Sequence, residues 1–312
     1  MTRIGVVDIG TNSTRLLVVD VEGGLVLARH ERRSEVTRLG QGVDASGRLA
    51  EEAMERVRGA LRPYVARMDE LEAERRVAVL TSAVRDAENG AGFVAEVRDG
   101  FRLEARTLSG EDEARLTFRG ATSERPRDDD TPLVVIDIGG GSTEMVTGSR
   151  AEKEWGASTQ MGVVRLTERH LHTDPPRAGE LDALAADAAQ IIRKAAPEGV
   201  RERVRAAVAV AGTATSLGAI DLALEPYDPD RVHGHRLSLR RLEELLARLA
   251  ALPESERRDV AGLHPDRAPT VVAGVLILRE VLRAFGLDSF EVSEHDILRG
   301  VALDAAEGPR AT

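Results

Sequence analysis

The chain has 312 residues, of which 42% are hydrophobic and 31% charged, a composition typical of a folded protein large enough for two domains. It contains no cysteine, which excludes disulfides, thiolate metal sites and cysteine nucleophiles. The net charge of −10 argues against general nucleic-acid binding. No apolar stretch reaches the roughly 20 residues of a membrane span, and the N-terminus does not resemble a signal peptide, so a cytoplasmic protein is expected.

The first predicted element is a buried strand over residues 4–10, which leads into a turn of glycine and hydroxyl residues after Asp8. Further strands are predicted over residues 15–21 and 24–30. Rossmann and P-loop turns lead directly into a helix, whereas this turn leads into β-branched residues and must be the bend of a hairpin. Its backbone N–H groups and hydroxyls form a concave loop that suits a phosphate group.

The next segment alternates between helices and strands, which predicts a mixed sheet with crossover helices. Helices are predicted over residues 47–70, 87–97 and 110–118, and strands over residues 77–81 and 103–108. Arg85 follows the first of these strands. Residues 120–132 are polar and aperiodic, which places a domain boundary there, and Asp128-Asp129-Asp130 is interpreted as exposed linker rather than a metal site.

The second half restarts the same plan. Val134-Val-Ile-Asp137-Ile-Gly139-Gly-Gly-Ser142-Thr-Glu144 aligns with the first turn, so that Asp137, Gly139, Ser142 and Thr143 match Asp8, Gly10, Ser13 and Thr14. Strands are predicted over residues 144–147, about 152–158, 204–210 and 290–293, and helices over residues 177–196, 238–251, 269–285 and 296–305, the third of them largely apolar and buried. Gly212-Thr-Ala-Thr215 is predicted to be a turn between a buried strand and a helix.

A duplicated, hairpin-first α/β domain is the layout of the actin-like ATPase, or ribonuclease H-like, fold, with a cleft between two lobes. The expected N-terminal lobe is 1–125, which the C-terminal helix at about 296–308 would complete in one version of this prediction. The expected C-terminal lobe is 126–312.

Six motifs in this order resemble the exopolyphosphatase/guanosine pentaphosphate phosphatase (Ppx/GppA) family over essentially the whole chain. They are Asp8-Ile-Gly-Thr-Asn-Ser-Thr-Arg15, Thr81-Ser-Ala-Val-Arg85-Asp-Ala-Glu-Asn89, Ser109-Gly-Glu-Asp-Glu113-Ala-Arg115, Asp137-Ile-Gly-Gly-Gly-Ser-Thr-Glu144, Met161-Gly-Val-Val-Arg165-Leu and Gly212-Thr-Ala-Thr215. The resemblance implies a hydrolase that cleaves terminal phosphoanhydrides.

The two copies of the turn differ in that Arg15 in the first corresponds to Glu144 in the second. This difference indicates that the first copy binds phosphate and the second binds a metal ion. Asp137 and Glu144 can converge on one Mg²⁺ across the hairpin, with Asp8 as a third carboxylate through water. The alternative for Asp8 is that it caps its own turn. The predicted phosphate-binding residues are Gly10, Thr11, Asn12, Ser13, Arg15, Arg85, Gly139, Gly140, Gly141, Ser142, Thr143, Gly212 and Thr213.

Glu113 occupies the position of the family's catalytic glutamate and would accept a proton from the attacking water. Local sequence does not separate it from Glu111, because both stand at a helix N-terminus where acidic residues are common. The family pattern, in which the base precedes an Ala-Arg pair, favours Glu113. The seven histidines form no recognisable site, and His295 is assigned no role.

The predicted function is Mg²⁺-dependent hydrolysis of the terminal phosphate of inorganic polyphosphate. The alternatives are a guanosine pentaphosphate phosphatase, a non-catalytic polyphosphate or guanosine polyphosphate sensor, and an ATP-dependent kinase or chaperone of the same fold, against which all six motifs count. Longer family members add C-terminal helical domains, so this chain is expected to favour shorter polyphosphates. Its expected partners are these phosphorylated ligands, with no nucleic acid and no membrane, and a homodimer is a family-level expectation.

Overall fold

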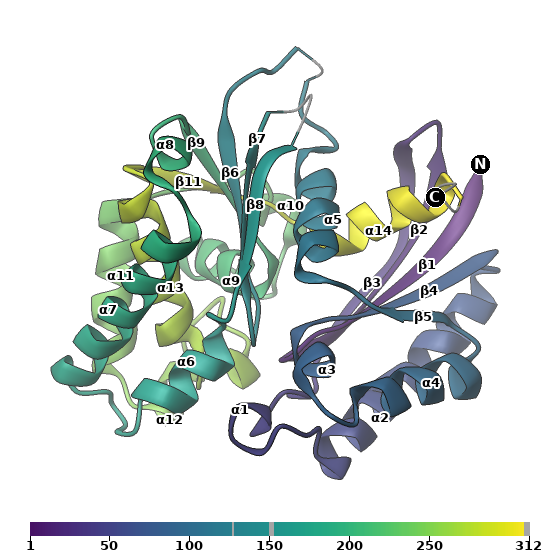
Figure 1. The fold of residues 1–312 in the computed structure, drawn as a ribbon, viewed down its shortest axis with the longest axis horizontal. Helices are drawn as coiled ribbons and strands as arrows, with labels where there is room; N and C mark the ends of the chain where they lie inside the picture. Colours follow the sequence, from purple (N-terminus) through teal and green to yellow (C-terminus); the bar gives the residue numbers. More distant parts are fainter. Residues whose placement is uncertain (127, 150–152, 309–312) are drawn as a thin grey trace. The chain divides into compact units, whose positions relative to one another are not determined.

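The computed structural model describes residues 1–126, 128–149 and 153–308, and the chain divides into two compact units (Figure 1). Unit 1 comprises Met1 to Ser123 together with the chain from His295 onward, and unit 2 comprises Glu124–Glu294. The predicted boundary at residue 126 lies close to the observed one. Unit 2 ends at Glu294 rather than at residue 312, because the last helix packs within unit 1, as in the version of the prediction in which that helix completes the N-terminal lobe.

Unit 1 contains a five-stranded sheet in the order β3-β2-β1-β4-β5. The strands are β1 (Thr2–Ile9), β2 (Ser13–Glu22), β3 (Leu25–Val36), β4 (Arg75–Leu80) and β5 (Glu104–Thr107). The helices are α1 (Val43–Ser46), α2 (Glu51–Glu70), α3 (Ser82–Asp86), α4 (Gly90–Phe101), α5 (Gly110–Thr122) and α14 (Ile297–Ala306). The first three strands form an antiparallel meander, and β4 and β5 continue it in parallel to β1.

Unit 2 repeats this plan in a six-stranded sheet in the order β10-β11-β9-β6-β7-β8. Its strands are β6 (Leu133–Ile138), β7 (Thr143–Gly148), β8 (Lys153–Thr159), β9 (Ala206–Val210), β10 (Arg236–Ser238) and β11 (Ser289–Val292). Its helices are α6 (Val163–His170), α7 (Ala178–Ala195), α8 (Glu198–Arg201), α9 (Ala211–Asp221), α10 (Pro229–Val232), α11 (Leu239–Ala251), α12 (Glu254–Arg257), the 3₁₀ turn η1 (Pro265–Arg267) and α13 (Val271–Ala284). Again an antiparallel meander, β6-β7-β8, adds parallel strands beside its first strand. The repeated topology confirms the duplicated, hairpin-first α/β fold.

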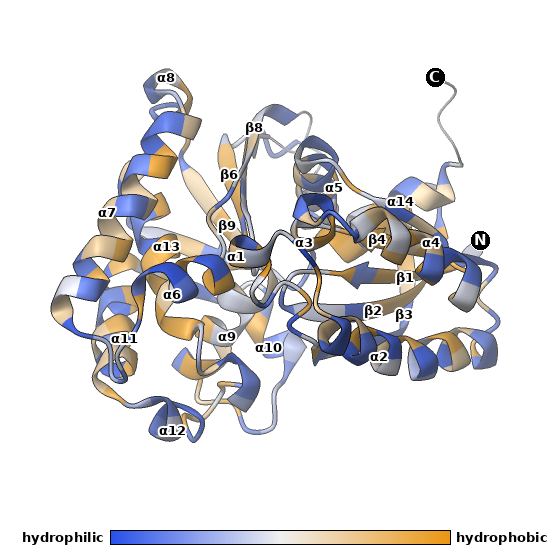
Figure 2. Cartoon of the chain, turned by 60° about the horizontal axis from the view of Figure 1, so that its bottom comes forward, coloured by the Kyte–Doolittle hydropathy of each residue, from blue (hydrophilic) through white to orange (hydrophobic). Residues whose placement is uncertain are grey.

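Helix α13 is buried along most of its length, as its apolar sequence predicts. Figure 2 shows it mainly in hydrophobic colours, whereas the short helix α12 is mainly hydrophilic. The strand predicted over about 152–158 is β8, and residue 152 lies outside the described residues.

Two predicted helices differ from the observed ones for local reasons. The helix predicted from residue 47 begins only at Glu51, because Gly47 has a left-handed φ of 68° and ends the separate short helix α1. The helix predicted over 87–97 begins only at Gly90, as α4, and a separate short helix, α3, precedes it. Between them the side chain of Asn89 bonds the backbone of Leu49 at both its N–H and its C=O, which fixes a turn at that point.

The side chains of β1 alternate between two hydrophobic clusters. Val7 and Ile9 face the cluster built with α2 and α4, whereas Ile4 and Val6 face the cluster built with α5 and α14. By the same alternation Asp8, the residue before the end of β1, lies on the face that α5 and α14 cover. The carboxylate therefore stands at the end of a packed sheet face rather than on an open loop.

Helices α5 and α14 pack so closely that glycine is required at two positions. A Cβ on Gly300 would lie 1.8 Å from the carbonyl oxygen of Leu116, and one on Gly120 would lie 1.9 Å from that of Asp296. We expect Gly300→Ala to lower the free energy of unfolding by about 2 kcal/mol or more, because the obstacle is backbone and cannot turn aside. Urea denaturation would measure this change.

The matched control for that substitution is Gly59→Ala in α2, where an added Cβ meets no atom within 4 Å. It should stabilise the protein by about 0.5–1 kcal/mol through helix propensity. Equal effects of the two alanines would contradict the close approach of α5 and α14.

Asp20 on β2 contacts the side chains of Arg3 and His30 at the far end of the unit 1 sheet. Arg3 Nε donates to Asp20 Oδ1 at 2.8 Å, and His30 Nε2 lies 2.7 Å from Asp20 Oδ2. The hydrogen bond from Arg3 is the main reason that the pKa of Asp20 falls from 3.8 to about 2, and His30 adds to it. A lowered carboxyl pKa stabilises the fold above the unfolded value, and this stability is lost as pH falls through about 2.

We therefore expect Asp20→Asn to lower the free energy of unfolding at pH 7, and the difference from wild type to shrink between pH 4 and pH 2. Urea titrations across this range would measure it. A difference that stays constant with pH would show that the ionised form of Asp20 does not stabilise the fold.

Candidate functional site

The two glycine turns follow β1 and β6, and in each the residues that carry charge stand directly opposite one another. Asp8 pairs with Arg15 across β1 and β2, and Asp137 pairs with Glu144 across β6 and β7. Opposite residues of an antiparallel pair point to the same face. In unit 1 a carboxylate therefore stands opposite a guanidinium, whereas in unit 2 two carboxylates stand opposite one another.

In the second turn, the carbonyl oxygens of residues 139–141 are all bound by the N-terminal end of α6. The backbone N–H groups of Val163 and Val164 donate to the first two at 2.9 Å, and Arg165 Nε donates to the third at 3.0 Å. A Cβ on Gly162 would lie 2.2 Å from the carbonyl oxygen of Gly140, so glycine is needed for this contact. The N–H groups of Gly140 and Gly141 have no acceptor within the described residues. They are therefore two backbone donors that can bind an anion.

The first turn is held in a similar way by the segment after β3. The carbonyl oxygens of Thr11 and Asn12 accept from the backbone N–H groups of Gly40 and Arg38 at 2.8 and 2.9 Å, and Thr11 Oγ1 accepts from the N–H of Ala83 at 3.2 Å. In the part of the chain that the structure describes, the N–H groups of Thr11 and Asn12 have no acceptor. Each unit thus presents backbone donors at the end of its first strand.

Glu113 lies in the first turn of α5, which Ser109 caps by accepting from the N–H of Asp112. Its side chain is buried, and Oε2 accepts a hydrogen bond from Arg85 Nη1 at 3.1 Å. Arg85 Nη1 also donates to the carbonyl of Leu108 at 3.0 Å, which fixes the guanidinium beside the carboxylate. Glu111 is exposed, so burial and the Arg85 contact distinguish two glutamates that local sequence could not.

The two acids of unit 2 are almost completely buried. Asp137 is 6% exposed and Glu144 is 1% exposed, and Glu144 Oε1 accepts a hydrogen bond from the hydroxyl of Ser158 at 2.6 Å. The two residues are opposite one another in the antiparallel pair of β6 and β7, so their carboxylates lie on the same face of the sheet. The pair therefore fits a hard divalent cation with oxygen ligands.

The Gly212-Thr213 motif differs from its prediction, because it lies within the first turn of α9 rather than in a separate turn. The change of direction is confined to Ala211, which has a left-handed φ of 60° directly after β9. The hydroxyl of Thr213 donates to the carbonyl of Ile138 at 3.4 Å, which ties the start of α9 to the second glycine turn. The N–H groups of this first turn form a site where an anion is favoured.

Arg15 contacts two acids. Its Nε and Nη2 donate to Asp8 Oδ2 at 3.0 and 2.5 Å, and its Nη1 donates to Oδ2 of Asp296, which caps α14. Burial raises the pKa of Asp8 in spite of the guanidinium beside it. Burial alone would also raise the pKa of Asp296, but the charges of Arg15 and Arg32 and the bond from the N–H of Leu298 lower it.

Asp296 has no predicted role, because it stands 281 residues from its partner Arg15 in the sequence. The signal that could have singled it out is an acidic residue directly between a predicted last strand and a predicted closing helix. Arg165, which binds the second glycine turn, lies in a motif that was recognised but received no chemical role.

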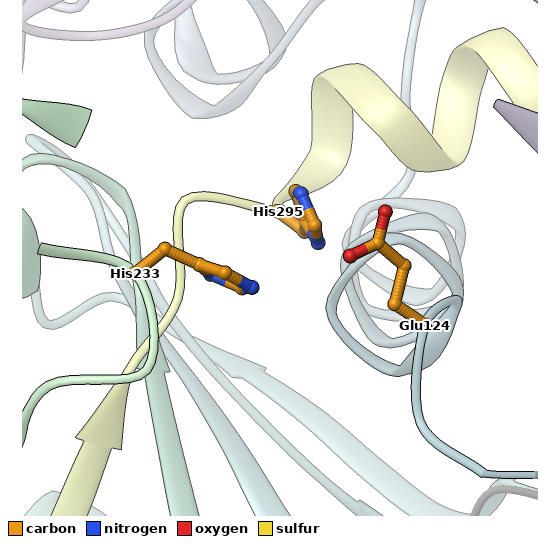
Figure 3. A group of neighbouring side chains, drawn as sticks. All are labelled: Glu124, His233 and His295. Carbon is orange, nitrogen blue, oxygen red and sulfur yellow. The ribbon is translucent and has the colours of Figure 1, made fainter. Parts of the chain in front are cut away.

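The histidines take part in local contacts. His233 Nδ1 accepts from the N–H of Glu294 at 3.2 Å in unit 2, and His295 Nε2 lies 3.3 Å from Arg299 Nη1 in unit 1. Figure 3 draws the side chains of His233 and His295. His235 and His170 lie 2.8 and 2.9 Å from Asp221 and Asp187.

Comparison with known proteins identifies the family of this site. The profile of the Ppx/GppA phosphatase family matches residues 17–307. The chain is 40% identical to exopolyphosphatase 2 of Mycobacterium tuberculosis over 98% of this chain and 99% of that relative. The chain belongs to the Ppx/GppA phosphatase family.

Solved structures of Ppx/GppA proteins share the whole fold. A family member from Aquifex aeolicus superposes with a TM-score of 0.82 at 28% identity, covering 100% of this chain and 99% of that one. An exopolyphosphatase from Cytophaga hutchinsonii superposes with a TM-score of 0.89 at 27% identity, covering 99% of both chains. Among the described residues, no helix is both long and apolar enough to span a membrane.

Proposed function

We propose that this Ppx/GppA protein is an exopolyphosphatase, which hydrolyses the terminal phosphoanhydride of inorganic polyphosphate and releases orthophosphate. The observation that carries the proposal is the buried Glu113 carboxylate held by Arg85 at 3.1 Å. A positioned carboxylate beside a guanidinium supplies the base and the cation that attack of water on a phosphoryl group requires. The similarity to a mycobacterial exopolyphosphatase over 98% of the chain supports this substrate class.

In this mechanism Glu113 accepts the proton of the attacking water while Arg85 neutralises charge on the phosphoryl oxygens. The backbone donors of the two glycine turns and of the start of α9 orient the phosphates. The proposed phosphate-binding residues are Gly10, Thr11, Asn12, Ser13, Arg85, Gly139, Gly140, Gly141, Ser142, Thr143, Gly212 and Thr213. Arg15 belongs to the predicted set, but its guanidinium contacts the carboxylates of Asp8 and Asp296.

Asp137 and Glu144 are the residues that we propose for holding Mg²⁺ in unit 2, and Asp8 supplies an oxygen for a cation in unit 1. When bound, Mg²⁺ would neutralise the phosphate charge that builds up on the leaving group. The hydroxyl of Ser158 orients Glu144 by donating to Oε1 at 2.6 Å. Asp137 and Glu144 fit the cation because carboxylate oxygens are the ligands that Mg²⁺ prefers, and the two residues stand opposite one another in register across β6 and β7.

The test is phosphate release from polyphosphates of defined length, compared with guanosine pentaphosphate and ATP, each with Mg²⁺ and with EDTA. We expect Mg²⁺-dependent release from polyphosphate at the highest kcat/KM. A higher kcat/KM for guanosine pentaphosphate would make the protein a guanosine pentaphosphate phosphatase instead. Binding of either ligand without turnover would make it a sensor, and both results would overturn the proposal.

A further inference from the structure

The carboxylate of Asp8 is held by only one of its two oxygens. Oδ2 accepts both hydrogen bonds from Arg15, whereas Oδ1 is buried and has no hydrogen-bond partner among the described residues. A buried carboxylate oxygen without a donor is costly unless a ligand satisfies it. Within unit 1, Oδ1 is therefore an oxygen available to a hard cation.

The orientation of that carboxylate depends on where the guanidinium of Arg15 is anchored. The Arg15 side chain is 11% exposed and uses its Nε and Nη2 edge for Asp8 and its Nη1 for Asp296. Arg32 Nη2 lies 3.8 Å from the same Asp296 oxygen and adds a second positive charge. A guanidinium shared between two acids is fixed in its plane, since its donors form a rigid fork.

Asp296 is itself firmly placed. Its Oδ1 accepts from the N–H of Leu298 at 3.0 Å as the cap of α14, and its side chain is 2% exposed. Its backbone carbonyl stands against Gly120 of α5, where a Cβ would lie 1.9 Å away. The anchor of Arg15 thus lies at the close contact between α5 and α14.

We propose that Asp296 is a positioning residue that, through Arg15, keeps Asp8 Oδ1 available as a ligand for a divalent cation. Arg15 then acts in this chain as the link between two carboxylates rather than as a phosphate ligand. Without the charge of Asp296, the guanidinium is free to take both oxygens of Asp8 as a bidentate pair, which removes the oxygen that the cation needs. The inference rests on the proposed function only in that Asp8 serves a metal-dependent reaction.

The test uses Asp296→Asn in the full chain and measures Mn²⁺ binding by electron paramagnetic resonance without polyphosphate. Asparagine keeps an oxygen to cap α14, so the helix should survive, but its amide N–H₂ then faces Arg15 and cannot anchor it. We expect Mn²⁺ to bind about 10–100-fold more weakly, as is usual for loss of a partner that orients a metal ligand. Asp8→Asn should weaken binding at least as much.

The matched control is Asp304→Asn, which removes an acid from the same helix. Asp304 binds Arg115 at 3.0 Å and lies about 12 Å further along α14. It should leave Mn²⁺ affinity within about twofold of wild type. If the effect passes through Arg15, then Arg15→Lys combined with Asp296→Asn should bind Mn²⁺ no more weakly than the weaker single variant.

Activity assays separate this inference from the proposed function. With polyphosphate, Asp296→Asn should raise the Mg²⁺ concentration for half-maximal rate and leave KM for polyphosphate within about twofold. An unchanged Mn²⁺ affinity in Asp296→Asn or in Asp8→Asn would overturn the inference, as would a raised KM with normal metal affinity, which would make Arg15 a phosphate ligand. If the wild-type protein fails to cleave polyphosphate but Asp296→Asn still weakens Mn²⁺ binding, then the proposed function fails and the inference stands.

Discussion

Replacing Glu113 by Gln is expected to lower kcat for polyphosphate hydrolysis by about 10²–10⁴-fold with little change in KM. The amide keeps the size of the side chain and its oxygen can still accept from Arg85, which lies 3.1 Å from Oε2 in the wild type. It cannot accept a proton from water at neutral pH, so the step that needs a base is the step that is lost. Steady-state phosphate release at saturating Mg²⁺ measures the effect.

The control for this variant is Glu111→Gln, in the same helical turn but exposed. Both substitutions remove one negative charge near the N-terminus of α5, so any effect through the helix dipole should be shared. We expect Glu111→Gln to keep kcat within about twofold of wild type. If Glu113→Gln stayed fully active, or if Glu111→Gln were the slower variant, the assignment of the base would be wrong.

The fold was predictable from sequence because its main signals are local and repeated. The Asp-Ile-Gly turns at Asp8 and Asp137 each lie between apolar runs, and a β-branched run after a glycine turn favours a hairpin over a helix. The opposition of Asp137 to Glu144 follows from the same pattern, since equal spacing on both sides of a short turn places the two residues in register. The Ppx/GppA motifs added the chemical interpretation.

The features that sequence could not provide depend on contacts between distant segments. The first turn of α6 holds the carbonyls of the second glycine turn, and only this contact indicates which backbone groups remain as donors. Asp296 is brought to Arg15 by the return of α14 to unit 1, which hydrophobic periodicity alone does not specify. The helix motif at Gly212 was mistaken for a turn because a single left-handed residue, Ala211, makes the bend without a glycine.

The second large effect is expected from Glu144→Gln, which removes one of the two buried acids of unit 2. We expect kcat/KM for polyphosphate to fall about 100-fold or more, because a Mg²⁺ site that contributes several kcal/mol to the transition state loses a charged ligand. The same variant has a readout without substrate. Mg²⁺ should raise the melting temperature of the wild-type protein, since a ligand that binds the folded state stabilises it, and should raise that of Glu144→Gln much less.

Glu154→Gln is the matched control, because Glu154 lies on the neighbouring strand β8 and is 47% exposed, whereas Glu144 is buried. The control should keep both the activity and the Mg²⁺-induced rise in melting temperature. The amide of Glu144→Gln can still accept from Ser158, so loss of that hydrogen bond does not explain a defect. If Mg²⁺ stabilised Glu144→Gln as strongly as wild type, the opposed acids of β6 and β7 would not be the metal site.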